Sequence, residues 1–363
     1  MSRIPFDPAE VENADIGVGM FGRPLKIYRT PVTPKENYRM VYERKVPHWL
    51  PMSGDMLMIT PRVDPDNIAR AFCFEANPLA PEEMIGGLDK FGIEWVYVPV
   101  ATGSMVRPGN PVLEDVNAWK EKIKFPDIDS WDWDGSKAAN ADHTNTDKFL
   151  AITILTGFFE RLVSFMDFEN AALALIDDDQ KDAVHDLFDA LADVYIKMVD
   201  KFVWAYNIDI LSLHDDWGAQ RAPFFSLDTC LEMIVPHIKK VSDYCHSCGI
   251  FFDLHSCGKN EMLVPAYIAA GCDSWGGQPI NDKNFVYENY GDKLLISIEP
   301  DVASDKFPPP PIEPEAAVAS AKRLIDKYGP SYATKPFLGG FFFGPPEYTD
   351  VLYAESRKLF NTL

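Results

Sequence analysis

The stretch Ile208–Leu213 reads IDILSL, a short run of apolar and β-branched residues that predicts a buried β-strand. It lies between two stretches with helical spacing. In Asp178–Val203, apolar side chains recur at intervals of three and four residues. Ser226–Cys248 repeats the pattern, with Ser226 as a candidate N-cap and Gly249 as its stop. A strand flanked by helices along the chain indicates a parallel sheet wrapped by helices.

Seven further runs of the same kind extend this alternation, and no change in charge or composition marks a second domain. Eight strands alternating with helices favour an α/β fold closed as a (β/α)8 TIM barrel over an open sheet. The seven runs are Val46–Leu50, Trp95–Val100, Ala151–Leu155, Ile250–Leu254, Asp273–Gly276, Leu294–Ile298 and Pro336–Phe343.

Two regions fall outside the strand and helix alternation. Residues 1–45 are Pro-rich, and we expect an irregular N-terminal arm packed on a single catalytic barrel domain that spans 46–363. The segment 108–142 is rich in Asp and Trp and is bounded by prolines. It is too polar for a core helix, and we expect an insertion that decorates one rim of the barrel.

The net charge of −21 disfavours nucleic acid and anionic membranes as partners, because both would repel the protein at long range. No apolar run approaches the length of about 18 residues that a membrane span needs, and no signal peptide is recognisable. We therefore expect a cytoplasmic protein that acts on a small molecule or on a protein partner. Six cysteines are too few for a disulfide scaffold in a chain of 363 residues.

Polar residues at the carboxyl ends of barrel strands face the substrate, so these positions hold the candidate chemistry. Asp215 and Asp216 are adjacent carboxylates that could supply a general acid or base. Either one could instead cap a turn or pair with Arg221. Glu160 is a third candidate, with an ion pair to Arg161 as the alternative.

His255 and Cys257 are two residues apart on an extended segment, so their side chains point to the same side. Imidazole and thiolate suit Zn²⁺, which needs three or four ligands. The alternative is a hydrogen-bonded histidine beside an inert buried cysteine. Candidates for the missing ligands are Glu299, Asp215, Asp216, Cys272 and Asp273.

Four segments resemble the uroporphyrinogen-decarboxylase-like superfamily, and within it the corrinoid-dependent methyltransferases. An H-x-C-G element that follows a D-D-W-G-x-Q element is typical of these methyltransferases, and the decarboxylases proper lack the His-Cys pair. The similarity runs over roughly residues 40–345. The segments are Val46–Pro51, Leu213–Gln220, Leu254–Asn260 and Ala269–Asp273.

The resemblance implies a TIM barrel that transfers a methyl group between a small donor and the cobalt of a separate corrinoid protein. The insertion at 108–142 resembles the O-demethylase-like members, which act on aryl methyl ethers. In several relatives a later cysteine near the eighth strand completes a zinc site, and the run Pro336–Phe343 contains none. Either Glu299 replaces that thiol, or this branch has lost tight zinc binding.

The resemblance leads to a set of expected substrate-binding residues and to several alternative functions. We expect a small aromatic methyl donor to be bound by Trp217, Gln220, Gln278, Phe342 and Phe343, and we leave a homodimer open. One alternative is another donor or acceptor, such as methanol, a methylamine or a coenzyme thiol. A uroporphyrinogen-type decarboxylase would need arginine clamps, for which the early region offers Arg62 and Arg70. A corrinoid-binding protein without catalytic activity is a further alternative.

Overall fold

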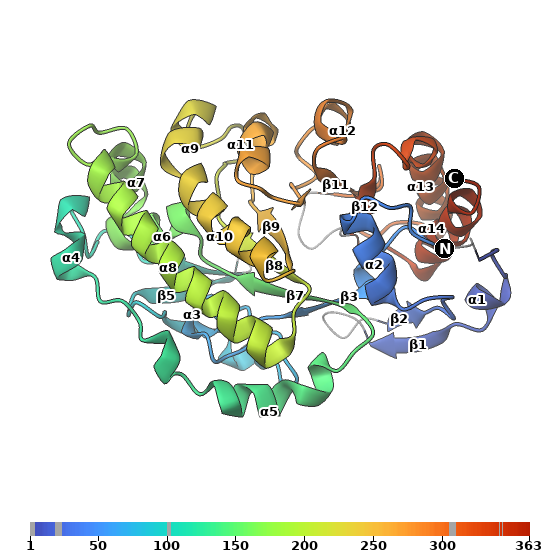
Figure 1. The fold of residues 1–363 in the computed structure, drawn as a ribbon, viewed down its shortest axis with the longest axis horizontal. Helices are drawn as coiled ribbons and strands as arrows, with labels where there is room; N and C mark the ends of the chain where they lie inside the picture. Colours follow the sequence, from blue (N-terminus) through green and yellow to red (C-terminus); the bar gives the residue numbers. More distant parts are fainter. Residues whose placement is uncertain (1–3, 19–23, 100–102, 305–309, 341, 343) are drawn as a thin grey trace. The chain divides into compact units, whose positions relative to one another are not determined.

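The computed structural model describes residues 4–18, 24–99, 103–304, 310–340, 342 and 344–363. The chain divides into two compact units. The first consists of Met1–Leu57, Asp147–Phe149 and Asp273–Leu363, and the second of Met58–Thr146 and Leu150–Cys272. Figure 1 shows the helices and strands along the chain.

The second unit is built on three parallel strands. They are β7 (Phe149–Ile154), β8 (Ile210–His214) and β9 (Phe251–His255), paired in the order β7-β8-β9. Every residue of β7 is buried. These strands confirm three of the predicted runs, and their pairing is parallel because helices cross over between them.

The crossover helices follow the predicted apolar spacing. α8 (Lys181–Tyr206) buries the apolar stripe that begins at Val184 and ends at Tyr206. Ser226 caps the next helical segment by accepting a hydrogen bond from the backbone N–H of Thr229, as predicted. That segment breaks at Ile234 into two helices. The other helices that follow β7 in this unit are α6 (Phe158–Met166), α7 (Phe168–Ala174), α9 (Leu227–Met233), α10 (Val235–Ser247) and α11 (Val264–Ala269).

The predicted strand at Trp95–Val100 belongs to a different sheet. It is β5 (Glu94–Val98), which pairs antiparallel with β4 (Gly86–Leu88) and β6 (Gly103–Val106). Its assignment to a parallel barrel was therefore wrong. The turn at Asp89–Ile93 is short enough to join β4 and β5 as a hairpin, which leaves no room for a crossover helix.

The insertion at 108–142 contains short helical turns and α4 (Trp119–Lys122), and α5 (Trp133–Thr144) begins within it. α5 packs along the carboxyl-terminal part of α8. The ring of Trp133 is buried against Phe202, and Ser136 Oγ lies 2.6 Å from Tyr206 Oη. The insertion is therefore more regular than its polar sequence suggested.

The first unit contains three parallel strands of its own. They are β10 (Ser274–Trp275), β11 (Leu295–Ile298) and β12 (Phe337–Gly339). The helices α12 (Lys283–Tyr290), α13 (Pro314–Tyr328) and α14 (Pro346–Phe360) follow β10, β11 and β12 respectively. These strands confirm three more predicted runs, although Phe341 and Phe343 lie outside the described residues.

The N-terminal arm is more ordered than predicted. It contains α1 (Ala9–Glu12), β1 (Asp15–Val18), β2 (Pro24–Ile27) and α2 (Pro34–Tyr42). Glu10 forms a buried ion pair with Arg357 of α14, with Oε1 and Nη2 2.7 Å apart. Tyr28 stacks on Tyr353 of the same helix, at a ring separation of 4.4 Å. The arm is thus packed on α14 within the first unit.

The predicted first strand, Val46–Leu50, is not a strand. Its backbone N–H groups bond to side chains instead of a neighbouring strand: His48 N donates to Asn37 Oδ1 and Leu50 N to Ser356 Oγ. The strand of this region is β3 (Met56–Ile59). The described residues therefore supply seven strands of the kind predicted, β3 and β7 to β12, where the sequence predicted eight. The α/β class is confirmed, and closure into an eight-stranded barrel stays a prediction. No helix of the described ranges is long and apolar enough to cross a membrane.

Candidate metal centre

The last residues of β8 and β9 are both histidines. His214 lies opposite His255 in the parallel register, and each strand ends on a Leu-His pair. The two imidazole rings stack with their centroids 5.1 Å apart and their planes 19° from parallel. Both side chains therefore lie at the carboxyl ends of adjacent strands, where parallel α/β folds place their ligands.

Cys257 joins these histidines two residues beyond β9. Its Sγ atom lies 3.6 Å from His255 Nε2, and one ligand atom from each of His214, His255 and Cys257 lies within 4.8 Å of the others. All three residues are partly buried. Two imidazoles and one thiolate form a set of soft and borderline donors suited to zinc.

A glycine fixes the backbone that presents Cys257. Gly258 has a φ of +87°, which favours glycine. A Cβ at this position would lie 2.2 Å from the carbonyl oxygen of Gly218. The loop after β9 can approach the loop after β8 this closely only with glycine at 258. This contact accounts for the glycine in the H-x-C-G element.

Asp216, one of the two adjacent aspartates predicted as a general acid or base, also faces this group. Its Oδ1 accepts a hydrogen bond of 2.7 Å from the backbone N–H of Cys257 and lies 3.6 Å from His214 Nε2. The Asp216 side chain is 32% exposed. It is therefore a carboxylate beside the His-Cys group that a ligand from solvent can reach.

Glu160, predicted as a catalytic residue, holds the other nitrogen of His214. Its Oε2 lies 2.7 Å from His214 Nδ1, and its Oε1 accepts from Arg70 Nη1 at 3.0 Å. Burial raises the pKa of Glu160, but Arg70 and His214 outweigh it and lower the pKa to about 2. Burial lowers the pKa of His214, yet Glu160 and Asp216 hold it well above its ordinary value. Burial raises the pKa of the Cys257 thiol.

Asp215 occupies the capping position that the sequence analysis left open as an alternative, and its catalytic role stays a prediction. Its side chain is fully buried, and its carboxylate accepts hydrogen bonds from the backbone N–H groups of Phe158, Phe159 and Glu160, at the start of α6. Burial raises its pKa to about 7. A carboxylate at a helix N-terminus satisfies N–H groups that lack partners within the helix. Asp215 thereby fixes the first turn of α6, on which Glu160 lies.

Trp217 supports Asp215 and does not offer its ring to a ligand. The indole is fully buried and packs against Tyr267, with the rings 4.8 Å apart. Its Nε1 donates to Asp215 Oδ2 at 2.9 Å. The predicted role of Trp217 in substrate binding is therefore not compatible with this position, because its ring faces lie within the protein interior.

The remaining predicted residues divide between the units. Gln220 is exposed in the turn that follows β8, in the second unit. Gln278, Glu299 and Phe342 belong to the first unit, and Phe343 lies outside the described residues. Glu299 pairs with Lys283 at 3.1 Å, and Phe342 packs on Tyr348 with the rings 4.7 Å apart. A part for these residues in the His-Cys group stays a prediction.

Two residues of this site were not predicted from the sequence: His214 as a candidate metal ligand, and Arg70 as the partner of Glu160. The signal for His214 was present, because the Leu-His pair recurs at the ends of two successive strands. Arg70 had no such signal. It lies 90 residues before Glu160 in the sequence, and only the fold brings the two together.

Comparisons with known proteins assign no family to this chain. No family model matches the sequence, and no curated protein matches it. Among solved structures, a chitinase from Rhizomucor miehei is similar with a TM-score of 0.33 and 11% identity, over 69% of this chain and 90% of the chitinase. A similarity at this level carries no argument about function.

Proposed function

We propose that this chain is a corrinoid-dependent methyltransferase that moves a methyl group from an aryl methyl ether to the cobalt of a separate corrinoid protein. The observation that carries the proposal is the convergence of His214, His255 and Cys257 at the ends of β8 and β9. The corrinoid partner and the aromatic donor rest on the family resemblance of the same segments.

The donor set matches a catalytic zinc site in number and kind. Such sites use three protein ligands and leave the fourth position to water or substrate. Glu160 engages Nδ1 of His214, which leaves Nε2 on the side of Asp216 and Cys257. A carboxylate on the far nitrogen is the usual support of a zinc-bound histidine.

Zinc, when bound here, would supply a Lewis acid for the ether oxygen as negative charge develops on it. The protein's own residues would prepare that step. Glu160 and Arg70 orient the ring of His214, and Gly258 sets the position of Cys257. Asp216 is the partly exposed carboxylate of the site, and its Oδ atoms can hold a proton for the departing phenolate.

The ion pairs of Arg62 and Arg70 disfavour the decarboxylase alternative. A substrate with several carboxylates needs arginine side chains that are available to bind it. Arg62 pairs with Glu75, and Arg70 pairs with Glu160. Both candidate clamps are therefore already engaged by carboxylates of the protein.

The test combines metal analysis with a methyl-transfer assay. The purified chain, prepared with zinc supplied, is expected to contain about one zinc per chain, and His214→Ala, His255→Ala and Cys257→Ala are expected to lose it. Cys248→Ala is the matched control, because Cys248 is an exposed thiol outside the site. In the assay, a methoxybenzoate is expected to yield a phenol and methylated cobalt on a reduced corrinoid protein.

The two parts of the proposal fail separately. A wild-type chain without stoichiometric zinc would overturn the metal site. A zinc-containing chain that converts no aryl methyl ether, but does convert methanol or a methylamine, would overturn the aromatic donor and favour the alternative donors. Release of CO2 from a tetrapyrrole carboxylate would instead establish the decarboxylase.

A further inference from the structure

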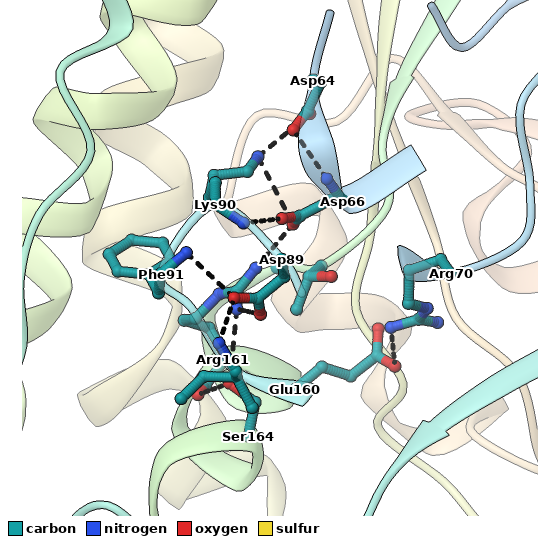
Figure 2. A network of polar contacts seen from close by, with 12 residues as sticks. Asp64, Asp66, Arg70, Asp89, Lys90, Phe91, Glu160, Arg161 and Ser164 are labelled. Carbon is teal, nitrogen blue, oxygen red and sulfur yellow. Dashed lines mark hydrogen bonds and ion pairs between the residues drawn. The ribbon is translucent and has the colours of Figure 1, made fainter. Parts of the chain in front are cut away.

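Five charged side chains form a fully buried group in the second unit, here called the buried charge cluster: Asp64, Asp66, Asp89, Lys90 and Arg161 (Figure 2). Lys90 Nζ lies 3.0 Å from Asp64 Oδ2 and 3.4 Å from Asp66 Oδ2. Arg161 Nη2 lies 2.6 Å from Asp66 Oδ2, and its Nη1 binds Asp89. Each of these side chains has no exposed surface.

Such a cluster is a costly way to stabilise a fold. Each buried charge loses its hydration, and apolar side chains of similar volume often give equal or greater stability. What ion pairs and forked guanidinium contacts provide in addition is a fixed geometry between the elements that carry them. The elements joined here are α3 (Pro65–Ala69), the turn between β4 and β5, and α6.

Two of these elements, α3 and α6, also carry the residues that support His214, namely Arg70 and Glu160. Arg161 follows Glu160 directly on α6, and in Figure 2 the two side chains point in different directions, one into the cluster and one toward Arg70. Asp66 is a residue of α3, and Arg70 is the C-cap of that helix, with its N–H bonded to the carbonyl of Asp66 at 2.7 Å. The contact between Asp66 and Arg161 therefore fixes the helix that carries Arg70 against the helix that carries Glu160.

Trp95 forms a second connection between the buried charge cluster and Arg70. Asp89 Oδ2 accepts a hydrogen bond of 2.9 Å from Trp95 Nε1. The guanidinium of Arg70 lies over the Trp95 ring, 4.5 Å from its centroid. Asp89 thus binds Arg161 directly and reaches Arg70 through one aromatic ring.

We propose that the buried charge cluster, together with Trp95 beside it, is a positioning device for His214, in which Arg161 and Trp95 are the positioning residues. Both hold Arg70 against Glu160, and Glu160 then holds the ring of His214. The inference rests on the proposed function for the metal that His214 would bind, although the orientation of the ring can be measured without any metal.

The first test replaces Arg161. Arg161→Gln removes the charge, and Arg161→Lys keeps the charge but loses the fork that reaches Asp66 and Asp89 together. Loss of the direct partner of a ligating histidine typically weakens metal binding by 10- to 100-fold, and because Arg161 acts through Arg70 and Glu160 we expect a smaller decrease, of about 3- to 10-fold, in zinc affinity for Arg161→Gln. The visible spectrum of bound Co²⁺, added alone, is expected to change in intensity. In Arg161→Lys, the zinc affinity and the Co²⁺ spectrum should both lie between those of Arg161→Gln and the wild type.

The second test uses Trp95, in case removal of Arg161 prevents folding. Trp95→Phe keeps an aromatic face under Arg70 and loses only the N–H bond to Asp89, whereas Trp95→Leu loses both. We expect zinc affinity in the order wild type, Trp95→Phe, Trp95→Leu. Arg62→Gln is the matched control, because Arg62 pairs with Glu75 outside the cluster, and it should leave zinc affinity unchanged.

A third readout needs no metal. In nitrogen NMR spectra of the histidine rings, assigned with His214→Gln, wild-type His214 is expected to show a strong hydrogen bond at Nδ1. This signature should be lost in Trp95→Leu and in folded Arg161→Gln. Folded variants with unchanged His214 signals and unchanged Co²⁺ spectra would overturn the inference. If the wild type binds no Co²⁺ but the His214 signals still respond, the positioning stands and the proposed zinc function fails.

Discussion

His214 and His255 face each other across the β8–β9 pair with their rings stacked 5.1 Å apart, at the last paired position of the two strands. The backbone register brings the rings together before any metal is considered. Because two strand ends and one loop must converge on the same point, the site depends on the sheet itself.

The first prediction concerns the two histidines as a pair. His214→Ala and His255→Ala should each abolish stoichiometric zinc, because either change leaves one histidine and one thiolate. The double variant should then lose no more than either single variant does, since ligands of one ion act as a unit. Zinc content by elemental analysis and zinc affinity by chelator competition measure this. Full additivity of the two losses would indicate that the histidines do not share an ion.

The second prediction concerns Glu160. Glu160→Gln keeps the shape of the side chain but removes the charge that binds Arg70 and His214. We expect zinc affinity to fall by about 10- to 100-fold, with little change in the far-ultraviolet CD spectrum. Glu232→Gln is the control, because this carboxylate is 54% exposed and lies on α9, away from the site. Equal zinc affinity in Glu160→Gln and the wild type would contradict the supporting role.

Much of the second unit's parallel core could be predicted from the sequence. The runs at β7, β8 and β9 are apolar, bounded by turns and separated by amphipathic helices, so that local pattern and tertiary structure agree. The apolar pattern predicted a strand at Val46–Leu50 that does not form, because side chains of Asn37 and Ser356 accept the hydrogen bonds of its backbone N–H groups. An apolar run shows that a segment is buried, but it does not show what its backbone bonds to.

The site was predictable only in part, for a related reason. His255 and Cys257 are close in sequence, and their spacing alone places both on one side of the chain. Asp215 and Asp216 look equivalent in sequence, yet one caps α6 and the other faces Cys257. Which of two adjacent carboxylates turns inward depends on where the next helix begins, and this is a property of the packed structure.

The third prediction separates these two aspartates by stability. Asp215→Ala removes the acceptor of three backbone N–H groups and of the Trp217 indole. Loss of a cap and of buried hydrogen bonds should lower the free energy of unfolding by about 3 kcal/mol. Asp216→Ala, at a partly exposed position, should lower it by less than about 1 kcal/mol and instead reduce methyl transfer. Urea unfolding of both variants measures the difference, and similar losses would contradict the assigned roles.

The fourth prediction concerns acid stability at a histidine pair between α8 and α10. His185 Nδ1 lies 2.9 Å from His237 Nε2. Burial, together with the neighbouring His185, lowers the pKa of His237 from 6.5 to about 4. Asp189, 4.0 Å away, opposes this shift, whereas Lys240 adds to it. In the unfolded chain His237 takes up a proton at a higher pH than in the folded protein.

This difference sets the sign of the effect. Above pH 6.5, His237 is neutral in both states and its contribution to the free energy of unfolding is fully present. This contribution is lost as the pH falls toward 4, because the unfolded state then binds more protons than the folded protein. The loss should be about 3 kcal/mol, the free energy that corresponds to this difference in pKa between the folded and unfolded states. His237→Gln keeps a polar side chain and cannot titrate. Its free energy of unfolding should therefore fall less than that of the wild type between pH 6.5 and 4, by urea unfolding at each pH. Parallel curves for the wild type and His237→Gln would mean that His237 titrates in the folded protein as it does in the unfolded chain.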